Sequence, residues 1–205
     1  MMLVLTLLCR DEADILESML RFHLAQGVDR IIATDNGSVD GSLEILQRFE
    51  QRGQLTLLQE AEQTHDQAVW VTRMARMAAA MGADWVINSD ADEFWWPQQG
   101  NLNSTLAQLP ESVEGLLVER TNFLPPPRDG QDQRPFYQRQ TLRERVSCNS
   151  LGAPLPPKLI HRAHPGVEIT DGNHGAKRNG TSIAGIKSSA IEILHVPIRL
   201  SLIHI

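Results

Sequence analysis

Three carboxylates stand within four positions near the middle of the chain, at Asp90, Asp92 and Glu93. Acids this close repel one another at neutral pH unless they share a cation or a proton. Mg²⁺ and Mn²⁺ prefer hard oxygen ligands and usually take one or two protein carboxylates together with substrate phosphates. The pattern predicts a divalent cation, Mn²⁺ or Mg²⁺, although an isolated D-x-D triplet is more often a solvated acidic turn.

The position of the acids favours a site over a turn. They directly follow Trp85, Val86 and Ile87, a short apolar run of strand-forming residues. Ligands of open α/β sheets bind beyond the carboxyl ends of the strands. A strand ending here would therefore deliver the acids to the edge where ligands bind.

The first half of the chain alternates strand-like and helix-like segments. Asp11 is the expected cap of the first helix, and the helices close at Gly27, Gly53 and Gly82. This is the βαβ pattern of a parallel sheet, whose right-handed crossovers place the loops after residues 8, 34, 58 and 89 along one edge. The expected strands cover residues 3–8, 28–34, 55–58 and 85–89, and the expected helices about 11–26, 41–51 and 67–81.

The second half is less regular. We expect a loop from residue 95, a short helix over 102–109, and strands near 115–119, 159–160, 167–170 and 191–196. Six arginines lie between positions 120 and 145, at 120, 128, 134, 139, 143 and 145. Such a run is usually a solvated loop, and here the alternative is a surface facing an anionic substrate.

Two histidines follow strand-like runs, His174 within an Asp171-Gly-Asn-His-Gly turn and His195 after an apolar strand. A single histidine is more often a structural hydrogen-bonding group than a metal ligand. In a chain with an acidic loop, the two roles are evenly balanced for this pair.

The bulk composition indicates a globular domain. The chain has 205 residues, a net charge of −6 and a pI near 5.6, which argues against a nucleic-acid binder with a broad positive field. Cys9 and Cys148 suggest neither a disulfide framework nor a zinc site. We expect a cytoplasmic protein without a transmembrane segment, with peripheral contact at the inner membrane face as an alternative.

Four blocks in order resemble a glycosyltransferase family 2-like protein, of the branch whose acidic motif reads D-x-D-E-F. They begin at Arg10 (RDEADIL), Asp35 (DNGSVDGS), Asp84 (DWVINSDADEF) and Ile193 (ILHVPIR). The resemblance implies an α/β fold of the GT-A type, which is Rossmann-like, with a mostly parallel central sheet flanked by helices and a smaller C-terminal acceptor-side region. One domain would cover 1–199, with 1–97 as the nucleotide-sugar-binding half and 98–199 as the acceptor-side half.

The resemblance also implies roles for single residues. Asp35 matches the acid that contacts the nucleotide base, and Arg73 lies near a basic position facing the donor. Asp90 and Asp92 match the pair serving ribose and metal, with Asp92 as the direct metal ligand. His195 matches a late histidine that closes the metal and diphosphate site.

The implied reaction is transfer from a nucleoside-diphosphate sugar, a UDP- or GDP-sugar, to a glycan, lipid or protein acceptor. A cation neutralises the charge that builds on the leaving phosphates. Inversion needs a carboxylate to take the acceptor proton from the opposite face of the sugar. Glu93, Glu168 and Asp171 are the candidates for this base, and we favour Asp171.

Two other functions share part of this pattern. A sugar-phosphate nucleotidyltransferase would share the sheet, but a glycine-rich phosphate loop is missing after the first strand. A non-catalytic carbohydrate-binding or scaffold protein would not need Asp35, Asp90, Asp92 and His195 together. Residues 200–205 do not read as part of the domain, and one set of codons for them resembles a transposase adapter. We expect a non-native tail there.

Overall fold

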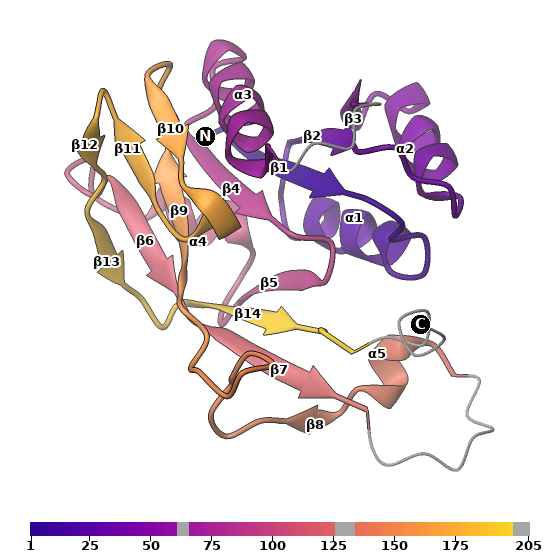
Figure 1. Ribbon diagram of the computed structural model, residues 1–205. Helices are drawn as coiled ribbons and strands as arrows, with labels where there is room; N and C mark the ends of the chain where they lie inside the picture. Colours follow the sequence, from indigo (N-terminus) through magenta and orange to yellow (C-terminus); the bar gives the residue numbers. More distant parts are fainter. Residues whose placement is uncertain (61–65, 126–133, 199–205) are drawn as a thin grey trace.

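A seven-stranded sheet forms the centre of the computed structural model, which describes residues 1–60, 66–125 and 134–198 (Figure 1). The strand order is β13-β6-β9-β4-β1-β2-β3. Its strands are β1 (Leu3–Cys9), β2 (Arg30–Asp35), β3 (Leu55–Gln59), β4 (Trp85–Ser89), β6 (Gly115–Val118), β9 (Lys158–Arg162) and β13 (Gly185–Lys187). The tail at 199–205 lies outside the described residues, as do His65 and Arg128.

Four neighbouring strands, β4-β1-β2-β3, are all parallel, as the βαβ pattern predicts. β1 is buried on both faces, because Leu3, Leu5 and Leu7 enter one apolar cluster and Val4 enters the other. Helix α3 (Gln67–Ala80) packs in the Val4 cluster, whereas α1 (Leu16–Ala25) and α2 (Ser42–Gln51) pack in the first cluster (Figure 1). The predicted mostly parallel α/β sheet flanked by helices is therefore confirmed.

The helix ends follow the prediction, except at the start of α1. Gly27 and Gly82 follow α1 and α3 with φ of 86° and 85°, a conformation that costs glycine little. Asp11, however, does not cap α1, which begins at Leu16. Its side chain instead accepts a hydrogen bond of 2.8 Å from the Val39 amide, so it ties the loop after β1 to the loop after β2.

A second, four-stranded sheet lies at the end of β4, with the order β5-β14-β7-β8 (Figure 1). Its strands are β5 (Glu93–Pro97), β7 (Arg120–Leu124), β8 (Leu142–Arg143) and β14 (Ile191–His195). Residues 95–97, expected in a loop, are thus in a strand that pairs with β14 nearly one hundred residues later. The Trp95 amide also donates to His23 of α1 at 3.2 Å.

The arginine-rich segment is also more ordered than expected. Arg120 begins β7 with a side chain only 9% exposed, and Arg143 of β8 pairs with Glu192 at 2.5 Å. The prediction of a solvated loop is wrong at Arg120, which is buried in a strand beside Glu93, whereas Arg143 is in a strand but remains 58% exposed. The remaining elements are α4 (Leu102–Ala107), α5 (Phe136–Arg139), η1 (Asp171–Asn173) and a small sheet of β10 (Val167–Ile169), β11 (Ala176–Arg178) and β12 (Thr181–Ser182).

Candidate active site

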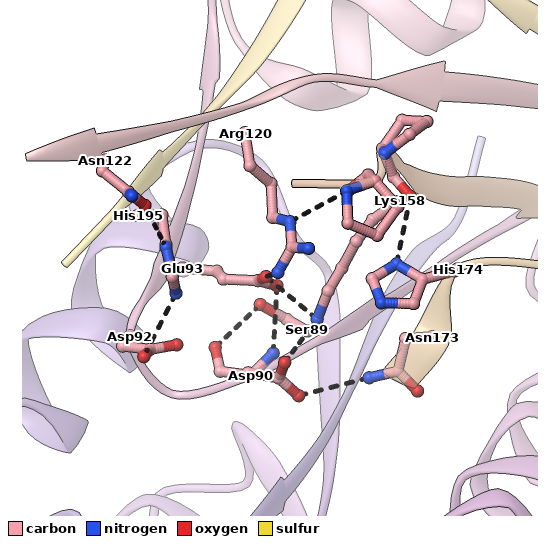
Figure 2. Close-up of polar contacts among 12 residues, drawn as sticks. Ser89, Asp90, Asp92, Glu93, Arg120, Asn122, Lys158, Asn173, His174 and His195 are labelled. Atoms are coloured by element: carbon pink, nitrogen blue, oxygen red, sulfur yellow. Dashed lines mark hydrogen bonds and ion pairs between the residues drawn. The ribbon is translucent and has the colours of Figure 1, made fainter. Parts of the chain in front are cut away.

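The acidic loop is a tight connection from β4 to β5, and it joins the two larger sheets (Figure 2). The Asp90 amide donates to Glu93 Oε2 at 3.2 Å, which folds the loop back on itself. The Trp95 indole donates to Ser89 Oγ at 3.0 Å, and that hydroxyl donates to the Asp90 carbonyl at 3.0 Å. These bonds fix the backbone at Asp90 and the direction of the Glu93 side chain.

One side of the loop is closed and charge-paired. Glu93 is fully buried, and its Oε1 lies 2.9 Å from Lys158 Nζ and 3.5 Å from Arg120 Nη1. Lys158, also fully buried, reaches Asp90 Oδ2 as well (Figure 2). Burial raises the pKa of Glu93 to about 7 against the lowering effect of Lys158. Burial also opposes the charge of Lys158, but the carboxylates of Glu93 and Asp90 outweigh it and raise the pKa of Lys158.

The other side of the loop is open. Asp92 Oδ2 and His195 Nε2 lie 3.4 Å apart, with side chains 23% and 13% exposed. The strand register brings them together, because His195 of β14 stands opposite Glu93 of β5 and beside Asn122 of β7. Asp92, in the turn before β5, and His195, at the end of β14, are therefore adjacent and both partly exposed.

Asn122 sets the orientation of the His195 ring. Its amide nitrogen donates to Glu144 Oε2 at 2.8 Å and to the Cys148 carbonyl at 3.0 Å, so its oxygen must be the atom 2.6 Å from His195 Nδ1. That oxygen accepts, which places a proton on Nδ1. In the neutral ring, the lone pair is then on Nε2, toward Asp92.

The loop at η1 closes the site from a third direction. The Asn173 amide donates to Asp90 Oδ1 at 3.2 Å, and His174 Nδ1 lies 3.1 Å from the Pro157 carbonyl (Figure 2). Burial lowers the pKa of His174, so its ring is neutral at pH 7. Asp171 is exposed and lies in the same turn, two residues before Asn173. Glu168 lies instead beside Arg76 of α3, 3.7 Å away.

Asp35 lies at the same edge of the sheet as the acidic loop. β1 alone separates β2 from β4, so the two backbones lie roughly 10 Å apart at the usual spacing of strands. Asp35 is 2% exposed, and its Oδ1 has no hydrogen-bond partner among the described residues. Arg73 pairs with Glu60 at 2.5 Å, and the Glu60 amide donates to the Asp35 carbonyl at 2.9 Å. Arg73 therefore stands at the Asp35 end of the edge.

The side chains of Asp92 and His195 fit a divalent cation whose other ligands come from a substrate. Within the described ranges, there is no cluster of three or more His, Cys, Asp or Glu side chains that would hold a metal ion by itself. Mg²⁺ and Mn²⁺ sites that bind phosphates need only one or two protein ligands. Asp92 and His195, whose Nδ1 is anchored by Asn122, would supply two such ligands.

Comparison with known proteins identifies the group to which this site belongs. The model of glycosyltransferase family 92 matches residues 9–170, which is more than half of the chain. The chain belongs to glycosyltransferase family 92. Membership in family 92 confirms the predicted glycosyltransferase. The matched range contains Asp35, the acidic loop and Lys158, whereas His195 lies beyond it.

Solved structures support the fold of this family 92 chain. S. aureus TarS 1-349 matches with 16% identity and a TM-score of 0.51 over 80% of this chain and 47% of that chain. S. aureus TarS matches with 13% identity and a TM-score of 0.50 over 80% and 28%. Glucosyl-3-phosphoglycerate synthase from Mycobacterium tuberculosis matches with 17% identity and a TM-score of 0.38 over 63% and 44%. The two TarS matches show the GT-A fold; no curated protein matches.

The chain spans less than half the length of these solved structures. Within the part of the chain that the structure describes, none of the helices combines the length and the apolar character that crossing a membrane requires.

Sequence reasoning missed four residues of the site, namely Lys158, Arg120, Asn122 and Asn173. Arg120 was seen only as one member of an arginine run. The signal for Lys158 was its place directly before the apolar Leu159-Ile160 pair, since a lysine that is buried with such a run has to pair with an acid. Asn122 and Asn173 carry no comparable signal, since their roles depend on strand register and on the η1 turn.

Proposed function

We propose that this family 92 chain transfers a sugar from a nucleoside-diphosphate sugar, with Mn²⁺ or Mg²⁺, to an acceptor hydroxyl with inversion. The observation that carries the proposal is the Asp92 and His195 pair, 3.4 Å apart and partly exposed at the edge of the sheet that also holds Asp35. This edge is where open α/β sheets bind nucleotides.

Asp35 is the proposed contact to the nucleotide base. Its buried Oδ1 lacks a partner among the described residues, and a donor N–H of the base would supply one. Arg73 is a proposed cation facing the sugar donor. It lies near Asp35, because the amide of its partner Glu60 donates to the Asp35 carbonyl. Asp90 is the proposed ribose contact, because its side chain is 37% exposed while Lys158 and Asn173 hold it in place.

Asp92 and His195 are the proposed metal ligands. When bound there, a divalent cation would neutralise the charge that develops on the diphosphate leaving group. Arg120 and Lys158 form the positive wall behind these ligands, and their pairing with Glu93 keeps that wall fixed. The protein thus presents a positioned cation site and a preorganised positive surface.

Asp171 is the proposed base that takes the acceptor proton. It is exposed in η1, and this turn is anchored to Asp90 through Asn173. Glu93, the other catalytic candidate, is a poor base in this arrangement, because a fully buried carboxylate between Lys158 and Arg120 has no surface for an acceptor. We propose that Glu93 positions the cationic wall instead.

Both halves of the predicted single domain contribute to this site. Residues 1–97 supply Asp35, Arg73 and the acidic loop, and residues 98–199 supply Lys158, Asp171 and His195, which supports the proposed donor and acceptor halves. Cys9 and Cys148 are unpaired thiols, consistent with the proposed cytoplasmic location.

Nucleotide binding tests the proposal. We expect UDP or GDP to raise the melting temperature when Mn²⁺ is present and to have little effect when Mn²⁺ is removed with a chelator. Hydrolysis of the matching nucleotide sugar would then report turnover. If no nucleoside diphosphate shifts the melting temperature with Mn²⁺, the proposal fails, and a non-catalytic role for the fold gains support.

A further inference from the structure

Lys158 is a fully buried cation within the acidic loop itself. It begins β9, the strand between β6 and β4, and its ammonium contacts two of the three acids, Asp90 and Glu93 (Figure 2). A buried ammonium is stable only when it is paired with carboxylates. The contact with Glu93 is an ion pair at 2.9 Å without aligned hydrogen-bond geometry, so attraction of charge dominates it.

The charges on this side of the loop balance. When Glu93 is ionised, Asp90 and Glu93 carry two negative charges, and Lys158 and Arg120 carry two positive charges within 3.5 Å of them. Both oxygens of Asp90 are already in contact with a donor, one with Lys158 and the other with Asn173 at 3.2 Å. The second Glu93 oxygen accepts from the Asp90 amide at 3.2 Å.

We propose that Lys158 is a resident cation that excludes a divalent metal from Asp90 and Glu93 and so confines it to Asp92 and His195. Lys158 is then a positioning residue, because it selects the acid of the D-x-D-E sequence that binds the metal. The proposal rests on the proposed function, since it concerns the cation of that site. It concerns metal binding without nucleotide and can be measured separately.

The proposal makes an unusual prediction, namely that removing Lys158 tightens metal binding. Without the Lys158 charge, Arg120 beside Glu93 remains as a positive partner, so the net charge beside Asp92 becomes more negative and a nearby divalent cation is attracted more strongly. We expect Lys158→Met to bind Mn²⁺ alone at least about tenfold more tightly than wild type, as measured from the electron paramagnetic resonance signal of free Mn²⁺. Lys158→Arg keeps the positive charge, so its Mn²⁺ affinity should stay within about twofold of wild type.

A matched control separates this local effect from net charge. Lys187 is 82% exposed and lies 3.9 Å from Glu119, far from the acidic loop in the sheet order. Lys187→Met removes the same charge from the surface, so we expect its Mn²⁺ affinity to stay within about twofold of wild type. Equal tightening in both variants would overturn the role of Lys158.

Isosteric variants keep the test decisive if Lys158→Met does not fold. In wild type, Asp90→Asn should change Mn²⁺ affinity less than about threefold, whereas Asp92→Asn should weaken it at least about tenfold. The double variant Lys158→Met, Glu93→Gln has a neutral side chain at position 93. In this background, adding Asp90→Asn should lower Mn²⁺ affinity at least about tenfold.

Two results would overturn the proposal. One is a folded Lys158→Met protein, by circular dichroism, that binds Mn²⁺ no more tightly than wild type. The other is an equal loss of Mn²⁺ affinity in Asp90→Asn and Asp92→Asn. A UDP and GDP titration of the same wild-type sample keeps the proposed function separate, because failure of that titration alone removes the nucleotide and leaves the Lys158 result standing.

Discussion

The two sides of the acidic loop differ in access although they are adjacent in sequence. Glu93 is fully buried and paired with Lys158 and Arg120, whereas Asp92 is 23% exposed and faces His195. A carboxylate that is enclosed by fixed cations supports the fold and the local field. A carboxylate that is reached from solvent is available for a ligand. The D-x-D-E motif of this chain, Asp90 to Glu93, therefore contains both kinds of acid, and burial distinguishes them.

The largest expected effect is on stability, from the closed side. Glu93→Ala leaves Lys158 and Arg120 with a buried, uncompensated charge, so we expect a loss of about 3 to 5 kcal/mol in the free energy of unfolding, measured by urea denaturation. Glu119→Ala is the matched control, because Glu119 forms an exposed ion pair at 3.9 Å with Lys187 and should cost less than about 1 kcal/mol. Similar losses for both variants would abolish the distinction between the two sides.

The next effect is on catalysis, from the open side. Asp92→Ala should lower turnover of the nucleotide sugar by roughly 100- to 1,000-fold, because it removes a ligand for the charge-neutralising cation. Its urea midpoint should stay close to that of wild type, since the side chain is partly exposed. Glu111→Ala, at another exposed acid, serves as the control and should retain turnover. An Asp92→Ala protein that is active would contradict the assignment of the open side.

The fully buried His23 extends the comparison to pH. Burial lowers the pKa of His23 from its ordinary value of 6.5 to about 4, so the folded state disfavours the charged ring. Its contribution to stability is present above pH 6.5 and is lost as the pH falls toward 4, at up to about 1.4 kcal/mol per pH unit. We expect His23→Gln to flatten the dependence of stability on pH over this window, as measured by urea denaturation at a series of pH values. A slope unchanged in His23→Gln would contradict burial as its cause.

The smallest expected effect is on metal affinity, from Asn122, which holds the His195 ring on the open side. Asn122→Ala should weaken Mn²⁺ binding about 10- to 100-fold, because His195 loses the acceptor that keeps its Nε2 turned toward Asp92. Asn122→Asp keeps an acceptor for Nδ1–H and should restore part of the affinity. If Asn122→Ala binds Mn²⁺ as wild type does, His195 needs no anchor, and its role as a ligand loses its support.

The sequence predicted the part of the fold that depends on local pattern. The parallel strands β1 to β4 and their helices follow from apolar runs and terminal glycines, and the edge with Asp35 and Asp90 follows from crossover handedness. The second sheet could not be predicted, because β5 needs β14, a partner nearly one hundred residues away. Trp95-Trp96-Pro97 resembles a loop until that partner is known.

The site divides in the same way. The acids and His195 were found because a motif lies at the end of a strand. Lys158 and Asn122 were missed because their roles come from contacts between β9, β7 and the acidic loop. Spacing along the sequence does not contain those contacts. The burial of Glu93 was not predicted for the same reason, since it depends on contacts with Arg120 and Lys158.

The most direct test of the account is a calorimetric titration of UDP and GDP into wild type and Asp92→Asn, each with Mn²⁺ and with a chelator. We predict that wild type binds at least one of the two nucleotides about tenfold or more tightly with Mn²⁺, and that Asp92→Asn loses this dependence on the metal. Equal affinity with and without Mn²⁺ in wild type, or an Asp92→Asn protein that keeps the full metal dependence, would contradict the account.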